Sequence, residues 1–242
     1  MYYYVNETTT YPKSNWIQFV KEISVNEGEG KKYIHIKIVS KKETYYYTSN
    51  PIILDHVAPK IEMFTMDCKP FSEKYANGPI TVNVIDDNEE IEIIYTLNEK
   101  KYKENNKSIS LYQDGNYSIY AKDGASNFSV AIEFTIDTIL PTITKIDNKS
   151  FAGTSYSTRE GNITIEGSEA LACYNLGYKG VKESQYQALN DNETTFNIKL
   201  KKGVNTLTIY DLAGNESKTY EIIYSPRFFQ DTQLLLFVFS SL

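Results

Sequence analysis

Apolar and polar residues alternate along most of this chain, and helical spacing is almost absent. Clear period-two runs occupy residues 80–85, 117–121, 132–136, 163–165, 196–200, 207–209 and 220–222. Such alternation predicts β-strands with one buried face. Turn-forming combinations of Gly, Asn, Asp and Pro separate the runs, as at Asn77-Gly-Pro and Asp114-Gly. Many short strands at this spacing predict an all-β chain built from β-sandwiches.

An earlier run, residues 33–38, alternates in the same way. Its isoleucines at 34, 36 and 38 take one face, so Tyr33, His35 and Lys37 take the other. The pattern predicts that His35 lies on the outward face of its strand. Three consecutive tyrosines, 45–47, follow on the next strand, and alternation predicts that at least one of them is buried.

Several residues recur at a fixed separation, which indicates an internal repeat. Asp55 and Asp137 are 82 residues apart, and each stands four residues before a proline, Pro59 or Pro141. Two further pairs, Asp123 with Asp211 and Asn127 with Asn215, are both 88 residues apart. We therefore predict units at residues 1–58, 59–140 and 141–224, the first of them incomplete, followed by a tail at 225–242.

The residues of the second and third units carry a family resemblance. The second has Asp114-Gly-Asn-Tyr117, a strand ending at Asp123, Asn127 and then Phe134-Thr-Ile-Asp137; the third has a strand from Gly203 to Asp211-Leu-Ala-Gly214-Asn215. This pattern resembles the bacterial immunoglobulin-like domains that occur in tandem in cell-surface and secreted proteins. The first unit matches only in its later half. Ser126 departs from the pattern, since it stands where glycine is usual before Asn127.

The resemblance implies a role for each repeated residue. Tyr117 would be the corner tyrosine at the start of the sixth strand, and 123–127 the tight hairpin that follows it. Residues 130–136 would form the last strand. The segments from Asp55 to Pro59 and from Asp137 to Pro141 would be short joints between sandwiches, because proline has no N–H to offer a sheet. Asp123, Asp211, Gly214 and Asn215 would shape the loops.

Charge and cysteine content narrow the function classes. The chain has 242 residues and a net charge of −6, with 31 acidic against 25 basic side chains. This balance argues against a nucleic-acid partner, which calls for clustered Lys and Arg. The two cysteines, Cys68 and Cys173, are too few for a disulfide framework or a cysteine-only zinc site.

The end of the chain is apolar but short. Residues 234–242 read LLLFVFSSL, and a membrane-spanning helix needs about 20 apolar residues. No membrane span is expected. The tail either packs on the last sandwich or is not native to the protein, and we favour the second interpretation.

Catalytic motifs are missing from the sequence. His35 and His56 are the only histidines, and neither accompanies a nucleophile motif. A glycosidase needs two carboxylates facing across a cleft, and the acids here stand at strand ends. We expect no enzymatic activity and no catalytic residue.

Clustered acids raise the question of a metal. Asp86, Asp87 and Glu89 lie in the turn after the strand 80–85, and Ca²⁺ takes six to eight oxygen ligands. Asp55 and Asp137 in the joints could share a cation with loop acids of the adjoining sandwich. A solvated acidic turn, and a local hydrogen bond from each joint aspartate, are the simpler interpretations. We expect no cofactor, with calcium as the alternative.

Exposed aromatic residues offer a ligand-binding alternative. Trp16, Tyr45 and Tyr47 could form a platform for a glycan or a host protein. The sequence favours a different role, that of a structural spacer, or stalk, in an extracellular bacterial protein such as an adhesin. Its partners would then be the neighbouring domains of a longer surface protein. A third option is an accessory domain of a secreted polysaccharide-degrading enzyme.

Overall fold

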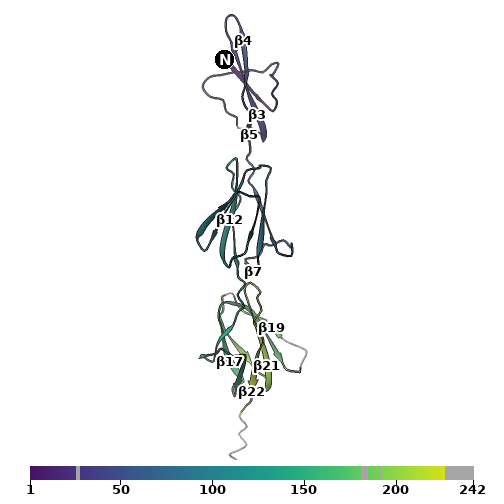
Figure 1. The fold of residues 1–242 in the computed structure, drawn as a ribbon, viewed down its shortest axis with the longest axis vertical. Helices are drawn as coiled ribbons and strands as arrows, with labels where there is room; N and C mark the ends of the chain where they lie inside the picture. The colour runs from purple at the N-terminus through teal and green to yellow at the C-terminus, as the bar shows by residue number, and fades with distance from the viewer. Residues whose placement is uncertain (26–27, 181–184, 191, 227–242) are drawn as a thin grey trace, which may run out of the picture. The chain divides into compact units, whose positions relative to one another are not determined.

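The computed structural model describes residues 1–25, 28–180, 185–190 and 192–226. Within these ranges the chain is all-β, with strands, turns and loops and no helix (Figure 1). The described residues therefore include no helix that is long and apolar enough to cross a membrane. The prediction of an all-β chain of tandem β-sandwiches is confirmed. The tail expected at 225–242 falls, from residue 227 onward, outside the described residues.

Residues 2–54 form a single antiparallel sheet. The strand order is β2-β1-β3-β4, and β5 also pairs with β3. The bounds are β1 (Tyr2–Asn6), β2 (Ile17–Gln18), β3 (Gly30–Val39), β4 (Thr44–Thr48) and β5 (Ile52–Leu54). The described residues up to 58 contribute no second sheet, so this unit has one layer where a sandwich has two.

His35 corrects one sequence prediction. It lies on the central strand β3 and is fully buried, not outward-facing. Its Nε2 is 2.9 Å from Asn6 Oδ1, and its Nδ1 is 2.9 Å from Thr48 Oγ1. The segment after β1 folds over this side of the sheet and brings the Tyr11 ring to 5.4 Å from the imidazole. Alternation predicted the face of the strand correctly but not the loop that covers it.

The three tyrosines of β4 also differ from the sequence prediction. All three remain exposed: Tyr45 at 56%, Tyr46 at 48% and Tyr47 at 62% of their surface. The prediction that at least one is buried was wrong. It assumed a second sheet, and no sheet covers either face of β4 among the described residues.

Residues 60–136 form two sheets, with orders β10-β9-β12-β13-β7 and β11-β8-β6. The bounds are β6 (Lys60–Thr65), β7 (Tyr75–Ala76), β8 (Ile80–Ile85), β9 (Ile91–Leu97), β10 (Lys100–Glu104), β11 (Ser108–Leu111), β12 (Gly115–Asp123) and β13 (Ile132–Ile136). Alternate side chains of β8, β9 and β12 are buried, and Val82, Ile93 and Ile119 are fully inaccessible. Each such burial contributes about 1.5–3 kcal/mol to folding.

Residues 143–224 form a second two-sheet sandwich, with orders β15-β14-β17-β20 and β16-β22-β21-β18-β19. The bounds are β14 (Ile143–Ile146), β15 (Lys149–Ser150), β16 (Ser155–Thr158), β17 (Asn162–Gly167), β18 (Leu171–Tyr178), β19 (Gln185–Ala188), β20 (Thr195–Lys199), β21 (Gly203–Asp211) and β22 (Tyr220–Tyr224). Both sheets contribute to one apolar core, which includes Ile165, Leu207 and Ile222.

Backbone proximity groups the chain into two compact units. The first holds residues 1–71, 81–111 and 116–133, and the second holds 72–80, 112–115 and the described residues from 134 onward. The three segments 1–58, 59–140 and 141–224 stay a prediction of the sequence.

Candidate functional site

The loop after β12 is tied to the linker that precedes β6, at the start of the first two-sheet sandwich. The Asn127 backbone N–H donates to Asp123 Oδ1 at 2.7 Å, and its side-chain Nδ2 donates to Asp123 Oδ2 at 2.7 Å. The same Nδ2 also donates to the backbone carbonyl of Asp55 at 3.0 Å. One asparagine therefore fixes the hairpin and holds the chain at Asp55. We call this arrangement the asparagine clamp.

The clamp recurs after β21 with the same atoms. The Asn215 N–H donates to Asp211 Oδ1 at 2.9 Å, and its Nδ2 donates to Asp211 Oδ2 at 2.8 Å. Its Nδ2 also donates to the carbonyl of Asp137 at 2.8 Å. Asp211 is 1% exposed, so these donors compensate a carboxylate that water barely reaches. The repeat seen in the sequence is thus a repeat of hydrogen bonds.

The linker aspartates and prolines have matching local geometry. Asp55 Oδ1 accepts a hydrogen bond from the Val57 N–H, and Asp137 Oδ1 accepts one from the Ile139 N–H, both at 3.0 Å. These side-chain turns set the direction of the chain two residues on. Pro59 and Pro141 are buried and lie just before β6 and β14.

One serine in each of the two loops makes a further hydrogen bond, and the sequence analysis did not identify either serine. Ser129 Oγ accepts from the Ala121 N–H at 2.8 Å, and Ser217 Oγ accepts from the Ile209 N–H at 3.0 Å. They too are 88 residues apart. That separation was the available signal, although serine is common enough in loops to be overlooked.

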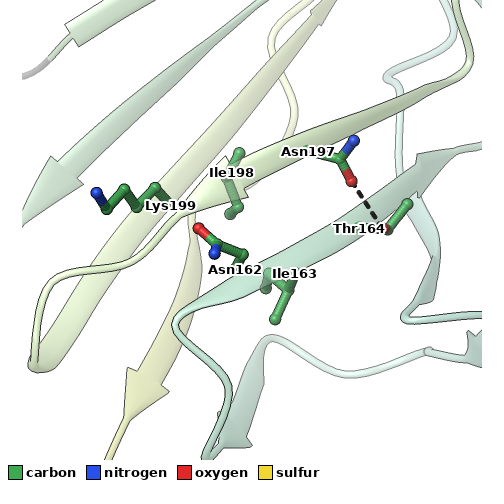
Figure 2. Close-up of a pocket in the computed structure, with 6 residues that line it drawn as sticks. All are labelled: Asn162, Ile163, Thr164, Asn197, Ile198 and Lys199. Carbon is green, nitrogen blue, oxygen red and sulfur yellow. Dashed lines mark hydrogen bonds between the residues drawn. The ribbon is translucent and has the colours of Figure 1, made fainter.

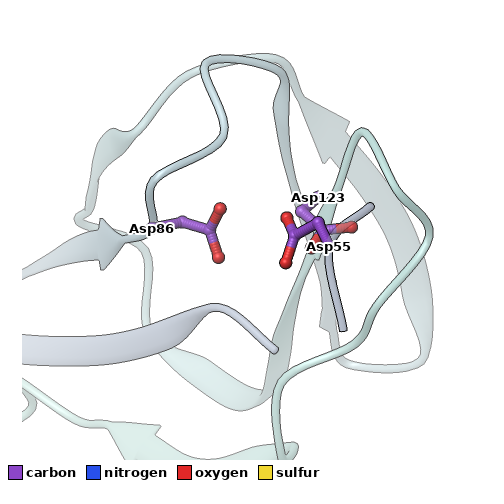
Figure 3. A group of neighbouring side chains, drawn as sticks. All are labelled: Asp55, Asp86 and Asp123. Carbon is purple, nitrogen blue, oxygen red and sulfur yellow. The ribbon is translucent and has the colours of Figure 1, made fainter. Parts of the chain in front are cut away.

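Three carboxylates meet beside each clamp. Asp55, Asp86 and Asp123 each offer an oxygen, and these atoms lie within 4.8 Å of one another (Figure 3). Asp137, Glu169 and Asp211 make the equivalent group. Asp86 follows β8 and Glu169 follows β17, so the two acids arise from equivalent loops. We call each group an acidic triad.

Glu169 was not among the residues predicted from the sequence. Its signal was a position 83 residues after Asp86, which is close to the repeat separation. A glutamate in place of an aspartate, and a loop of different composition, concealed the match. Asp87 and Glu89, predicted as calcium candidates together with Asp86, do not belong to the triad. Together with Asp55 and Asp86 of the triad, they line a cavity of about 1010 Å³.

The triads concentrate negative charge. Burial, and next to it the charge of Asp137, raise the pKa of Glu169 to about 7. Among the described residues, none of the six triad acids has an ion-pair partner within 4.0 Å. Such a group can hold a proton, or it can supply hard oxygen ligands of the kind that Ca²⁺ takes.

The remaining predicted residues take structural positions. Tyr117 lies on β12, is 4% exposed, and has its ring 6.2 Å from that of Tyr95. Gly214 has a backbone φ of 84°, and its equivalent Ser126 has a φ of 75°. Both loops therefore need the left-handed conformation, which glycine adopts without strain.

The aromatic candidates do not converge on one surface. Trp16 packs near Tyr46, with ring centroids 5.8 Å apart, and Lys37 Nζ lies 5.7 Å from the Trp16 ring. Tyr45 and Tyr47 flank Tyr46 on β4, so alternation directs them to the opposite face of the sheet.

A small pocket lies across β17 and β20 (Figure 2). It is lined by Asn162, Ile163, Thr164, Asn197, Ile198 and Lys199, and its volume is about 330 Å³. Thr164 Oγ1 donates to Asn197 Oδ1 at 2.7 Å, and Ile163 and Ile198 belong to the core. Lys199 is the one titratable side chain of the six, so this pocket has no acid–base pair.

No family model matches the chain, and no curated protein matches it. The similar solved structures include fibronectin(III)-like modules of Clostridium thermocellum CbhA, with 12% identity over 63% of this chain and 87% of that one, at a TM-score of 0.27. They also include three N-terminal domains of the bacteriophage RB49 highly immunogenic outer capsid protein, with 9% identity over 93% and 88% of the two chains, at a TM-score of 0.33.

Proposed function

We propose that this chain is a non-enzymatic spacer segment of a bacterial cell-surface or secreted protein such as an adhesin. Its partners are the neighbouring domains of that longer protein. The observation that carries the proposal is the repeated asparagine clamp, which joins the loop after β12 to Asp55 and the loop after β21 to Asp137.

The clamp supports a mechanical role because it acts on the linker rather than on a ligand. Asn127 and Asn215 each give one side-chain hydrogen bond to their own loop and one to the linker backbone. A linker held in this way has fewer conformations than a free one, so it transmits direction between sandwiches. Repeated along a chain, such joints would hold successive sandwiches end to end.

Small-angle X-ray scattering tests this role on the whole chain. The double variant Asn127→Ala, Asn215→Ala removes both linker bonds, and we expect a broader distribution of interatomic distances than in the unchanged protein. Asn106 and Asn162 are exposed asparagines, so Asn106→Ala, Asn162→Ala is the matched control and should leave the profile unchanged. Identical profiles for the clamp variant and the unchanged protein would contradict the spacer proposal.

Calcium at the joints is a second candidate, favoured by the recurrence of the acidic triad in two sandwiches. In each triad one acid comes from the linker and two from loops of the following sandwich. A cation held there would connect linker and sandwich more strongly than the clamp alone. The oxygens of Asp123 and Asp211 already accept hydrogen bonds, so further ligands would come from water or from the other two acids.

Thermal unfolding with and without calcium tests this second candidate. We expect added Ca²⁺ to raise the melting temperature measured in EDTA, because an ion that binds only the folded chain stabilises it. The double variant Asp86→Asn, Glu169→Gln should lose this increase while still folding, since it also removes like-charge repulsion. An unchanged melting temperature at millimolar Ca²⁺ would remove calcium from the account and leave the clamp untouched.

A further inference from the structure

The first sheet lacks an apolar core. Among the described residues up to 58, only Lys32 and His35 are buried, and both are polar. Among the described residues, Met63 in β6 is the first buried aliphatic or aromatic side chain. A sheet is normally stable only when its apolar face packs on another layer. This sheet has many apolar side chains, but no second sheet among the described residues up to 58 buries them.

Those side chains gather on one face. Strand register places Tyr3 of β1, Ile34, Ile36 and Ile38 of β3, and Tyr45 and Tyr47 of β4 on the same side. We call these six residues the open face. Ile38 is 46% exposed, and the two tyrosines are more than half exposed. Ile34 and Ile36 lie on a strand with neighbours on both sides, yet they are only partly buried.

The opposite face is covered by the chain itself. The Tyr11 ring packs there against His35, edge to face, and against Tyr46, with ring centroids 5.4 and 5.1 Å apart. The Thr8 carbonyl oxygen lies 3.1 Å from His35 Nε2. The two faces therefore differ: the side that holds His35 is covered by residues 8–11, while Ile38, Tyr45 and Tyr47 on the other side stay about half exposed or more.

We propose that the open face is a self-association surface on which a second copy of this chain docks. Two copies related by a two-fold axis would place their open faces together and build the two-layer arrangement that residues 60–136 and 143–224 each achieve within one chain. The symmetry is self-consistent, because a two-fold interface uses the same patch on both partners. Sheets packed in this way lie about 10 Å apart, with apolar side chains interdigitated.

Charge favours a like partner. The chain has a net charge of −6, so most surfaces of two copies repel. None of the six residues of the open face is charged, and Lys32, which alternation places on the same side of β3, is neutralised by Glu7, with Nζ 2.7 Å from Oε1. The neighbouring His35 is on the covered side. An uncharged apolar patch therefore suits an identical patch better than a charged ligand.

The available area is also sufficient. With aromatic side chains offering about 150–250 Å² when fully free, the open face and the adjacent Ile17, which is half exposed, provide roughly 600 Å² per copy. A standard stable interface buries about 800 Å² per partner. About 600 Å² per copy is the size of a weak, reversible interface, so we expect a dimer that dissociates on dilution.

Sedimentation equilibrium across a range of concentrations tests the proposal on the full chain. We expect a monomer–dimer equilibrium, and we expect Ile38→Glu or Tyr47→Glu to weaken it at least tenfold. Burying an unpaired carboxylate costs more than the roughly 1.4 kcal/mol that a tenfold change represents. Both side chains are about half exposed or more, so neither substitution removes a core residue.

Val39→Glu is the matched control. Val39 is adjacent to Ile38, is 51% exposed, and lies on the opposite face of β3. It should leave the dimer unchanged. A chain that stays monomeric at all concentrations would overturn the proposal, as would higher-order aggregates or a dimer that responds equally to Val39→Glu and Ile38→Glu. Circular dichroism of each variant checks that the sheets persist.

Discussion

At the scale of single residues, the two repeated loops differ at one informative position. Ser126 and Gly214 occupy equivalent places, and both have a positive φ, 75° and 84°. A Cβ on Gly214 would meet only Asn77 Nδ2 at 3.9 Å, an ordinary contact. The difference between the loops is therefore one of backbone strain rather than of space, because a side chain in the left-handed region costs about 1–2 kcal/mol.

A reciprocal exchange tests this strain. We expect Ser126→Gly to raise the free energy of unfolding of residues 60–136 by about 1 kcal/mol, and Gly214→Ser to lower that of residues 143–224 by a similar amount. Urea titrations of the two variants measure both changes. Equal, same-sign effects from the two substitutions would show that φ is not the cause.

A second prediction at this scale concerns the protonation of Glu169. Its pKa of about 7 in the folded chain lies above the ordinary value of 4.5, so folding favours the protonated form. The protonated Glu169 side chain therefore contributes to the free energy of unfolding fully below about pH 4.5. This contribution is lost as the pH rises through 7, because the folded chain must then hold a charged carboxylate. In EDTA, Glu169→Gln should therefore unfold at a higher temperature than the unchanged protein at pH 8, and at a similar temperature at pH 4.

The exposed Glu160 of the same sandwich supplies the control. Glu160→Gln should shift the melting temperature little at either pH. If the difference in melting temperature between Glu169→Gln and the unchanged protein is the same from pH 4 to pH 8, ionisation of Glu169 does not destabilise the folded chain, and the prediction is wrong.

At the scale of elements, the loop after β21 depends on one asparagine. Asn215→Ala would remove one of the two donors that Asn215 gives to Asp211, and it would leave one oxygen of a carboxylate with 1% exposure without that partner. The backbone N–H persists in alanine, so the lost donor is Nδ2. We expect a loss of about 1–3 kcal/mol in the free energy of unfolding. Denaturant titration beside Asn162→Ala, which should be near neutral, measures it.

The sequence predicted those elements in which alternation is strong. The run 80–85 became β8, and 132–136 became β13, because one face of each strand is buried and the other is not. The predicted last strand began two residues early, since Val130 is 85% exposed and precedes the pairing. The repeat separation singled out the residues of the loops and linkers, but it gave no indication of their hydrogen bonds.

Other elements left no such pattern. β1 reads Tyr-Tyr-Tyr-Val-Asn and β10 reads Lys-Lys-Tyr-Lys-Glu, so neither alternates between apolar and polar. Both are largely exposed or half-buried on both faces. The cover on His35 and the place of Glu169 in a triad depend on chain segments remote in sequence, which local patterns do not encode.

At the scale of the whole molecule, apolar burial is distributed unevenly. Residues 60–136 and 143–224 each have buried side chains at alternate strand positions, whereas the described residues of the range 2–54 include no buried hydrophobic side chain. Two parts of the chain can therefore resist unfolding on their own cores, and one depends on what packs against it. This distribution is what a spacer made of separately cored sandwiches requires.

Single-molecule force spectroscopy on the chain tests that central claim most directly. We predict two separate unfolding events, each releasing a contour length of about 28 nm, as expected for roughly 80 residues at about 3.5 Å each. The sheet formed by residues 2–54 should extend at low force without an event of comparable size. A single event that releases the length of both sandwiches together would contradict the account, because it would mean that they share one core.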